Sequence, residues 1–380
     1  MRLFPLPLLA CIPIAALLVG CPCTPGGGPT PTTLQQLVDQ EVGGVVDSRK
    51  AIGIAAAVIR GDQVSRFYYG ETVKGSGKAP DANTEFEIGS VTKTFTCALF
   101  ALMLADGVVT LDTPLQDLLP ASVHVPEYQG QKILLRHLAS HLSGLPTVPT
   151  NMDFFPLKDP YRDYTLENLY DFLGGYTLTR APGSAYEYSN MGMSLLGIAL
   201  SQKAGVPYEQ LVEDRVLTPL GLADTVFNLS DAQHARLAAP YRESLLSDYV
   251  CVPPVAWSEW HIGPFAPAGA LHSTLEDFVR YAQANLHATD NALAPAADLL
   301  YTPRFTVNDH IEVALGWHHV HTPTGLDVVF HDGETGSYCT FLGFVPATGE
   351  AVVLLANTSA ALFTDGAGFH VLDGLHALPQ

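Results

Sequence analysis

The sequence predicts an α/β fold: an antiparallel sheet flanked by helices, built from both chain ends, with a mostly helical lobe inserted between them. Strand patterns gather near the two ends of the 380 residues, whereas helical patterns separated by Pro/Gly loops fill the middle. The composition, 47% hydrophobic and 15% charged, is that of an ordered protein with a sizeable core. Strand-rich ends that share one sheet make the middle an insertion. We expect one domain over 34–380, with an α/β lobe from 34–110 and 310–380 and a helical lobe from 111–309.

The first residues predict an export signal. Arg2 precedes an apolar run that is interrupted by prolines and is too short for a comfortable membrane span. The run ends in LVGC, which resembles the lipobox of bacterial lipoproteins, so we expect a signal peptide over 1–20 and a lipid on Cys21. An ordinary signal peptide that is cut nearby is the alternative. Residues 21–33 are rich in Pro, Gly and Thr and are expected to form a tether.

The N-terminal part of the domain alternates helix and strand signals. Residues 34–50 suit a helix that breaks near Gly43-Gly44. Residues 51–70 read as two strands joined by a Gly61-Asp62 turn, which is a strong hairpin signal. The stretch FEIGS then leads into a long helix that is expected to end at Gly107 as its C-cap.

The middle and the C-terminal part have distinct periodicities. Helical patterns are expected at 133–144, 166–175, 191–205, 208–221 and 275–286. Strand patterns are expected at 312–320, 326–333, 338–346 and 350–357, followed by a closing helix over 361–375.

Charge and cysteine content limit the range of functions. The net charge of −19 argues against nucleic acid as a partner, because phosphate contacts need clustered Lys and Arg. Beyond Cys11 in the signal and Cys21, four cysteines remain that have no metal-type spacing and no assignable disulfide: Cys23, Cys97, Cys251 and Cys339. Cys97 lies in a helical pattern and is expected to be a buried small hydrophobe.

Ser90 and Lys93 form the first candidate catalytic pair. Residues three positions apart lie on the same face of a helix, where two side chains can meet. A serine hydroxyl attacks a carbonyl only when a nearby base removes its proton, and a lysine can be that base. The spacing alone is common, so the pair needs support from the rest of the chain.

The second candidate is Tyr188-Ser189-Asn190, at a junction between a turn-rich loop and a helix. A tyrosine becomes a base only if nearby positive charge stabilises its phenolate, and Lys93 could supply that charge. The Asn190 amide can fix both Lys93 and a substrate amide. A helix N-cap with a packing tyrosine is the alternative reading.

The third candidate is His331-Asp332-Gly333, which ends an apolar strand. Gly333 would let a ligand approach the backbone closely. Successive strand residues face opposite sides, so the Asp332 carboxylate is not expected to pair with the His331 ring. A structural histidine is the alternative, and His261-Ile262-Gly263, in a loop, is a weaker competing motif.

Together and in this order, FEIGSVTKTF, YSN and HDG resemble the three signature motifs of the serine β-lactamase and penicillin-binding protein superfamily, in its class C-like branch. The resemblance extends over about 34–378 and includes LLRHLASHLSGLP and PAGALHSTLEDFVRYAQANL. It implies a class C β-lactamase-like fold and an enzyme that needs neither a metal nor an organic cofactor.

The resemblance also implies roles for individual residues. Ser90 is the expected nucleophile, Lys93 and Tyr188 share the proton transfer, and Asn190 orients Lys93 and the substrate. The oxyanion hole is expected at the backbone N–H of Ser90 and at one just after Gly333, that of Glu334. His331 and Gly333 belong to the same substrate-binding strand.

One departure affects the expected substrate. Class C β-lactamases carry Lys-Thr-Gly at the third motif, and a lysine holds a substrate carboxylate, whereas an unperturbed histidine is mostly neutral at pH 7. His-x-Gly is usual in D-amino-acid peptidases, carboxypeptidase/endopeptidase penicillin-binding proteins and esterases of this branch. The segment DPYRDYTLENLYDFL also looks most like the carboxypeptidase/endopeptidase type.

We therefore expect a D-alanyl-D-alanine carboxypeptidase/endopeptidase-like enzyme in the bacterial cell envelope, with its domain on the periplasmic or extracellular side. A β-lactamase or an esterase with the same residues is the first alternative, and a penicillin-binding sensor without turnover is the non-enzymatic one. A metal site at His318, His319 and His321 is a further option that lacks another ligand of suitable spacing. The oligomeric state is left open.

Overall fold

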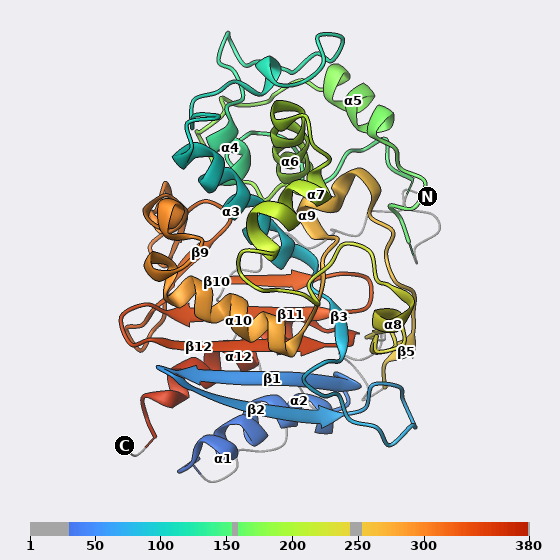
Figure 1. Cartoon of the computed structure of the whole chain (residues 1–380), viewed down its shortest axis with the longest axis vertical. Coiled ribbons are helices and arrows are strands. Elements are labelled where there is room, and N and C mark those ends of the chain that lie inside the picture. The colour runs from blue at the N-terminus through green and yellow to red at the C-terminus, as the bar shows by residue number, and fades with distance from the viewer. Residues whose placement is uncertain (1–29, 154–158, 244–252, 379–380) are drawn as a thin grey trace, which may run out of the picture.

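A large antiparallel sheet separates two helical layers in the computed structural model, which describes residues 30–153, 159–243 and 253–378 (Figure 1). The eight strands run in the spatial order β2 (Gln63–Gly70), β1 (Gly53–Arg60), β12 (Glu350–Ala356), β11 (Cys339–Val345), β10 (Asp327–Glu334), β9 (His318–His321), β8 (Ile311–Val313) and β7 (Phe305–Asn308). The N-terminal hairpin thus pairs with the C-terminal strands, which confirms that both chain ends build the sheet.

Three further short pairings lie outside this sheet. They involve β3 (Glu85–Glu87) with β6 (His272–Thr274), and β4 (Tyr241–Arg242) with β5 (Val255–Ala256) and β13 (Thr358–Ser359). The β3–β6 pair places the segment before Ser90 next to the segment before α10.

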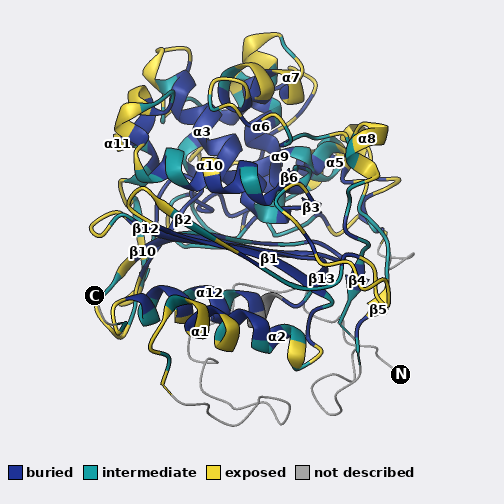
Figure 2. Cartoon of the chain, turned by 60° about the horizontal axis from the view of Figure 1, so that its bottom comes forward, coloured by how far each residue is buried: buried dark blue, intermediate teal, exposed yellow. Residues whose placement is uncertain are grey.

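The helices occupy both faces of the sheet and the inserted region (Figure 2). They are α1 (Leu34–Val38), α2 (Gly44–Asp47), α3 (Thr92–Ala105), α4 (Leu135–Ala139), α5 (Leu166–Gly175), α6 (Asn190–Ala204), α7 (Tyr208–Val212), α8 (Asp231–His234), α9 (Ala266–Gly269), α10 (Leu275–Leu286), α11 (Ala297–Tyr301) and α12 (Ala361–Leu375). Single π-helical turns follow α1 and α7, at η2 (Asp39–Gly43) and η5 (Glu213–Leu217). Short 3₁₀ turns occur at η3 (Gly89–Val91), η4 (Leu115–Asp117), η6 (Gly263–Phe265), η7 (Ala288–Asp290) and η8 (Ala294–Ala296).

Both faces of the sheet are buried, so its central strands are continuously apolar. In β1, Ile54, Ala56 and Val58 enter a core shared with α1 and α12, while Ala55 and Ile59 enter the core shared with the other layer. This alternation follows from the two-residue period of a strand. Figure 2 shows α1, α2 and α12 below the sheet and α3, α6 and α10 above it.

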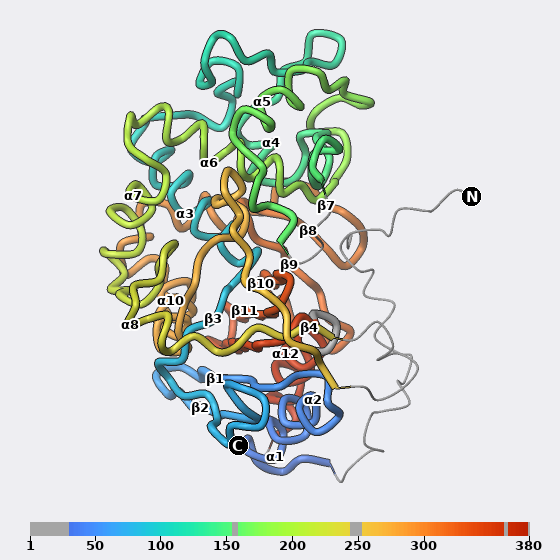
Figure 3. Tube along the Cα trace, turned by 90° about the vertical axis from the view of Figure 1, so that its right-hand side faces the viewer, coloured from blue at the N-terminus to red at the C-terminus, as the bar shows by residue number. Residues whose placement is uncertain are grey.

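The division into lobes at 110 and 310 stays a prediction. Within the range expected for the helical lobe, α10 packs on β1, β11 and β12, and β7 extends the sheet. Figure 3 shows α4, α5 and α6 of this range gathered beyond one end of the sheet layer.

Several expected elements differ in the structure. The expected break at Gly43-Gly44 is wrong, because both residues have helical dihedral angles and the chain continues from η2 into α2. The long helix ends at Ala105, and Gly107 follows in a left-handed conformation with φ of +70°, as a helix-terminating glycine does. The closing helix has the predicted bounds, Ala361–Leu375.

Candidate active site

Ser90 lies in the 3₁₀ turn η3, which connects β3 to α3. The chain reverses at Gly89, whose φ of +48° is readily adopted only by glycine. A Cβ on Gly89 would lie 2.8 Å from the backbone nitrogen of Glu334. The absence of a side chain therefore allows the Ser90 turn to sit directly against β10.

Lys93 is fully buried one turn further along, and its ammonium reaches Ser90. Its Nζ lies 2.7 Å from Ser90 Oγ and donates a second hydrogen bond of 2.7 Å to the Ala268 carbonyl oxygen. The same Nζ lies 4.9 Å from the centre of the Tyr188 ring. The predicted Ser-x-x-Lys pair is thus in direct contact, and a proton can pass along the Nζ–Oγ hydrogen bond.

The Tyr-Ser-Asn junction combines the two readings that the sequence left open. Ser189 is the N-cap of α6, because its Oγ accepts the Gly192 N–H at 2.8 Å. The residues on either side of this cap face the site: Tyr188 lies beside Lys93, and Asn190 lines the same pocket as Ser90. The Asn190 side chain hydrogen-bonds the Tyr161 hydroxyl.

Gly333 in β10 packs directly against the segment that precedes Ser90, and its expected role in ligand approach stays a prediction. A Cβ there would lie 2.1 Å from the Ile88 carbonyl oxygen, so the residue makes room for the protein's own chain. Thr340 Oγ1 donates to this same carbonyl at 3.0 Å. These contacts hold the turn that carries Ser90 against the sheet.

The edge of β10 next to Ser90 is open. β9 pairs only with Asp327–Phe330 of β10, so the following residues up to Glu334 extend past it. Glu334 therefore presents its main chain to the Gly89–Ser90 turn, while its carboxylate accepts a hydrogen bond of 2.6 Å from Ser359.

His331 is completely buried and does not line the Ser90 pocket. Its Nδ1 contacts the main-chain oxygen of Asp332 at 2.5 Å, and its ring centre lies 6.3 Å from that of Tyr188. Burial, helped by the nearby Lys93 charge, lowers the pKa of His331 to about 3. The ring is therefore neutral at pH 7.

Two more buried histidines, His141 and His318, lie next to Tyr188 and His331. The His141 ring lies 4.3 Å from Tyr188, and its Nδ1 accepts the Ser189 N–H at 3.1 Å. His318 Nε2 lies 2.9 Å from the Tyr186 hydroxyl, and its ring centre is 5.4 Å from that of His331. Burial lowers the pKa of His318 to about 3 and that of His141 well below its usual value.

The pocket at Ser90 is lined by residues from five segments. Of the predicted residues, Ser90, Asn190 and Glu334 line it, and the structure adds an aromatic and small-residue wall: Tyr161, Trp260, Ile262, Phe265, Ala268, Gly269 and Thr335. The segments around Tyr161 and Ala268 resemble those of the family, but their sequences alone indicate no role for these two residues. The Ala268 carbonyl that binds Lys93 has no side-chain signature.

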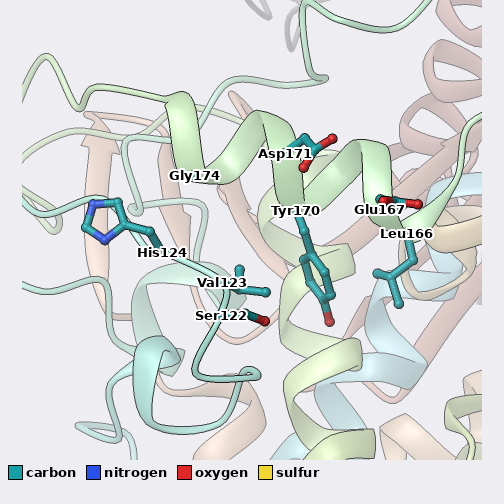
Figure 4. A pocket seen from close by; sticks show the side chains of 8 residues that line it. All are labelled: Ser122, Val123, His124, Leu166, Glu167, Tyr170, Asp171 and Gly174. Carbon is teal, nitrogen blue, oxygen red and sulfur yellow. The ribbon is translucent and has the colours of Figure 1, made fainter.

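A second hollow, of about 560 Å³, lies away from the predicted residues, between α5 and the loop at 122–124. Figure 4 shows the Tyr170 ring extending from α5 toward Ser122 and Val123.

Three other expectations concern the histidine-rich strand, the thiols and the membrane. His319 and His321 both lie near Asp327, at 3.6 and 3.7 Å, and within the described ranges no group of three or more His, Cys, Asp or Glu side chains is arranged to hold a metal ion. Cys97 is buried as predicted and, like Cys339, is a free thiol. Cys11, Cys21, Cys23, Cys251, the signal and residues 21–29 of the tether lie outside the described residues, and Thr33, at the end of the predicted tether, is the N-cap of α1. Among the helices of the described part, none has the length and apolarity to cross a bilayer.

A serine at a helix start, hydrogen-bonded to a buried lysine and placed beside an open strand edge, defines a serine hydrolase that works by acyl transfer. Comparison with known proteins agrees: the family model described as Beta-lactamase matches residues 34–372, so the chain belongs to that family.

Individual relatives span nearly the same length. A "Beta-lactamase" of Pseudomonas fluorescens is 28% identical over 358 residues, covering 86% of this chain and 94% of its own. "D-alanyl-D-alanine-carboxypeptidase/endopeptidase AmpH" of Escherichia coli K12 is 29% identical over 336 residues, covering 83% and 82%. The solved "Beta-lactamase/D-alanine Carboxypeptidase from Yersinia pestis complexed with citrate" superposes with a TM-score of 0.76 at 26% identity, covering 90% of this chain and 98% of that one. The predicted fold and family are confirmed.

Proposed function

We propose that the protein hydrolyses peptides ending in D-alanyl-D-alanine through an acyl-enzyme on Ser90, as a carboxypeptidase/endopeptidase-like penicillin-binding protein. The observation that carries the proposal is the 2.7 Å contact between Ser90 Oγ and the buried Lys93 Nζ, next to the open edge of β10. It supplies the nucleophile, its proton acceptor and donors for an oxyanion in one place.

The first half of the reaction forms an ester. Ser90 Oγ attacks the scissile carbonyl carbon while its proton passes to the Lys93–Tyr188 pair, for which Lys93 must first be in its neutral form. The N–H groups of Ser90 and Glu334 stabilise the developing oxyanion. The tetrahedral intermediate collapses, the C–N bond breaks, and the leaving amine takes the proton.

The second half releases the acyl group. Water attacks the ester carbonyl, the same pair accepts its proton, and that proton returns to Ser90 Oγ as the carboxylic acid product leaves. Asn190 and the wall around Tyr161 hold the acyl part of the substrate during both steps, because they line the pocket together with Ser90.

The buried, neutral His331 favours a peptidase over an efficient β-lactamase. It stands where class C β-lactamases carry a lysine, and His-x-Gly is the third motif usual in the peptidases of this branch. The relatives named "Beta-lactamase" keep hydrolysis of β-lactams as the second candidate, and an esterase is the third. Rates measured side by side on a D-Ala-D-Ala peptide, nitrocefin and p-nitrophenyl acetate rank these three, and the peptide is expected to lead by kcat/KM.

Ser90→Ala is the direct test of the nucleophile. We expect it to abolish hydrolysis and labelling by a fluorescent penicillin, while the exposed Ser184→Ala changes neither. Intact mass spectrometry with each substrate reports the acyl adduct and its release. Full activity in Ser90→Ala refutes the assignment, and a stable adduct without turnover of any substrate favours a penicillin-binding sensor.

We also propose that the enzyme is a cell-envelope lipoprotein anchored through Cys21. The LVGC motif and the Pro/Gly/Thr-rich residues 21–33 support an anchor and a tether. In a bacterial host, the wild type should partition with membranes and Cys21→Ser should not become lipidated. Absence of a lipid mass on the N-terminal peptide of the wild type would show that an ordinary signal peptide is cut instead.

A further inference from the structure

A buried carboxylate fixes an exposed histidine at the rim of the Ser90 pocket. Asp159, only 4% exposed, accepts hydrogen bonds from both the main chain and the ring of His261: His261 N lies 3.1 Å from Oδ1, and His261 Nδ1 lies 2.7 Å from Oδ2. Two bonds to one residue leave the imidazole little rotational freedom. Because Nδ1 lies against the carboxylate, it is the ring's donor to Asp159, and Nε2 donates to an outside anion when the ring carries its second proton.

The two side chains that bond Asp159 are both accessible to a ligand from solvent. The His261 side chain is 67% exposed although its partner is buried. Arg162, 57% exposed, donates from Nε to the same Asp159 oxygen at 3.1 Å. One buried negative charge thus orients two exposed groups that can each carry positive charge, on a chain whose net charge is −19.

The pair borders the substrate pocket through its sequence neighbours. Trp260 and Ile262, on either side of His261, line the pocket together with Ser90, and so does Tyr161, two residues after Asp159. Tyr161 in turn bonds Asn190, the residue that we propose contacts the acyl part of the substrate. Because Tyr161 bonds Asn190, to which the proposed function assigns the acyl part of the substrate, we place the rim at the acyl end of the pocket.

We propose that His261 Nε2 and Arg162 bind a carboxylate carried by the acyl part of the substrate, remote from the bond that is cleaved, and that Asp159 is the positioning residue of this subsite. The proposal deepens the proposed function and rests on it. The preferred substrates are then acidic acyl peptides. The nearby carboxylates Asp163 and Glu259 do not cancel the subsite, because Asp163 is exposed to solvent and Glu259 lies 3.5 Å from His234.

Matched peptides test the charge preference. N-succinyl- and N-glutaryl-Gly-D-Ala-D-Ala are compared with the corresponding carboxamides, which have the same shape and no charge. The wild type should favour the carboxylates about fivefold in kcat/KM, as one charge-assisted contact at an exposed rim allows. In His261→Asn the ratio should fall to about one or two, because the Asn amide replaces Nδ1–H toward Asp159 but has no atom in place of Nε2.

Two further variants separate charge from structure. Arg162→Met should lower the same ratio, whereas His310→Asn, an exposed histidine at the β7–β8 turn, should leave both the ratio and the rates unchanged. If the wild type shows a carboxylate-to-carboxamide ratio of kcat/KM near one with both the succinyl and the glutaryl peptides, the proposed subsite is refuted. The proposal also fails if His261→Asn lowers kcat/KM equally for the carboxylate peptides and the carboxamides. Equal losses would mean that His261 only maintains the local structure.

Acylation of Ser90 by penicillins tests the same subsite if the enzyme does not hydrolyse the peptides. Carbenicillin carries a side-chain carboxylate that benzylpenicillin lacks, so the ratio of their rates of Ser90 acylation reports the same subsite. Failure of peptide hydrolysis with normal acylation refutes only the peptidase assignment. Loss of the carbenicillin preference in His261→Asn supports the subsite, and an unchanged preference refutes it.

Discussion

A carboxylic acid buried three residues before the nucleophile should make the enzyme sensitive to alkaline pH. Glu87 is 4% exposed, accepts the Trp260 N–H at 3.0 Å and hydrogen-bonds the Thr335 side chain. Trp260 and Thr335 both line the Ser90 pocket. Burial, reinforced by Glu259 and Asp159, raises the pKa of Glu87 to about 8. The side chain is therefore neutral at pH 7 and joins two walls of the pocket.

The direction and size of the effect follow from the raised pKa. Between the unfolded value of 4.5 and about 8, the folded state holds a proton that the unfolded state has released, so stability is full below pH 4.5 and falls as the pH rises to about 8. At 1.36 kcal/mol per pH unit, the loss amounts to about 3–5 kcal/mol after some relaxation of the site. Glu87→Gln keeps the shape of the protonated acid and cannot ionise. It should raise the free energy of unfolding by about that amount at pH 9 and change it little at pH 4.5.

Urea unfolding from pH 4.5 to 9 measures this, and Glu85→Gln is the matched control. Glu85 is also fully buried with a pKa raised to about 8 by burial, but it bonds Arg236 and does not line the pocket. Both variants should be more stable than the wild type at pH 9. Only Glu87→Gln should also extend the pH range of Ser90 acylation upward. An unfolding free energy of Glu87→Gln that runs parallel to that of the wild type at every pH would refute the reasoning.

Two further predictions concern Lys93 and Gly333. Lys93→Met should slow penicillin acylation by about a thousandfold or more and leave the unfolding free energy equal or higher, because a buried charge is replaced by an apolar chain of similar length; a clear loss of stability would contradict this. Gly333→Ala should cost about 2–3 kcal/mol and slow acylation by about a hundredfold, since its Cβ meets the Ile88 carbonyl that supports Ser90. Gly44→Ala, in open space on a helix, should instead stabilise by about 0.5–1 kcal/mol, and equal effects of the two glycine variants would refute the steric argument.

The sheet was predictable because its signals are local and repeated. Each of the strands β1, β2, β10, β11 and β12 carries an apolar run bounded by turn residues, and the Gly61-Asp62 turn fixes the first hairpin. The three motifs could be found for the same reason, since each lies at the end of a regular element. That the three motifs lie close together in space could be predicted only from the family resemblance, because no single segment determines it.

The errors occur where contacts between distant segments decide the backbone. The helix expected at 133–144 is only α4, because His141 has φ of +58° and turns its ring toward Ser189. The strand expected at 312–320 is split into β8 and β9, with a turn at Gly316, where a Cβ would lie 2.8 Å from Cys97 Sγ. In both places a tertiary contact with the site overrides the local pattern.

Burial explains how the site distributes its charges. The rings of His141, His318 and His331 are neutral because burial lowers their pKa values, and the charge of the buried Lys93 lowers them further. These interior positions can therefore orient Tyr188 and Lys93 but cannot attract an anionic substrate. Recognition of charge has to come from groups that keep contact with water. The exposed His261 and Arg162, fixed by the buried Asp159, meet that requirement at the rim of the same pocket.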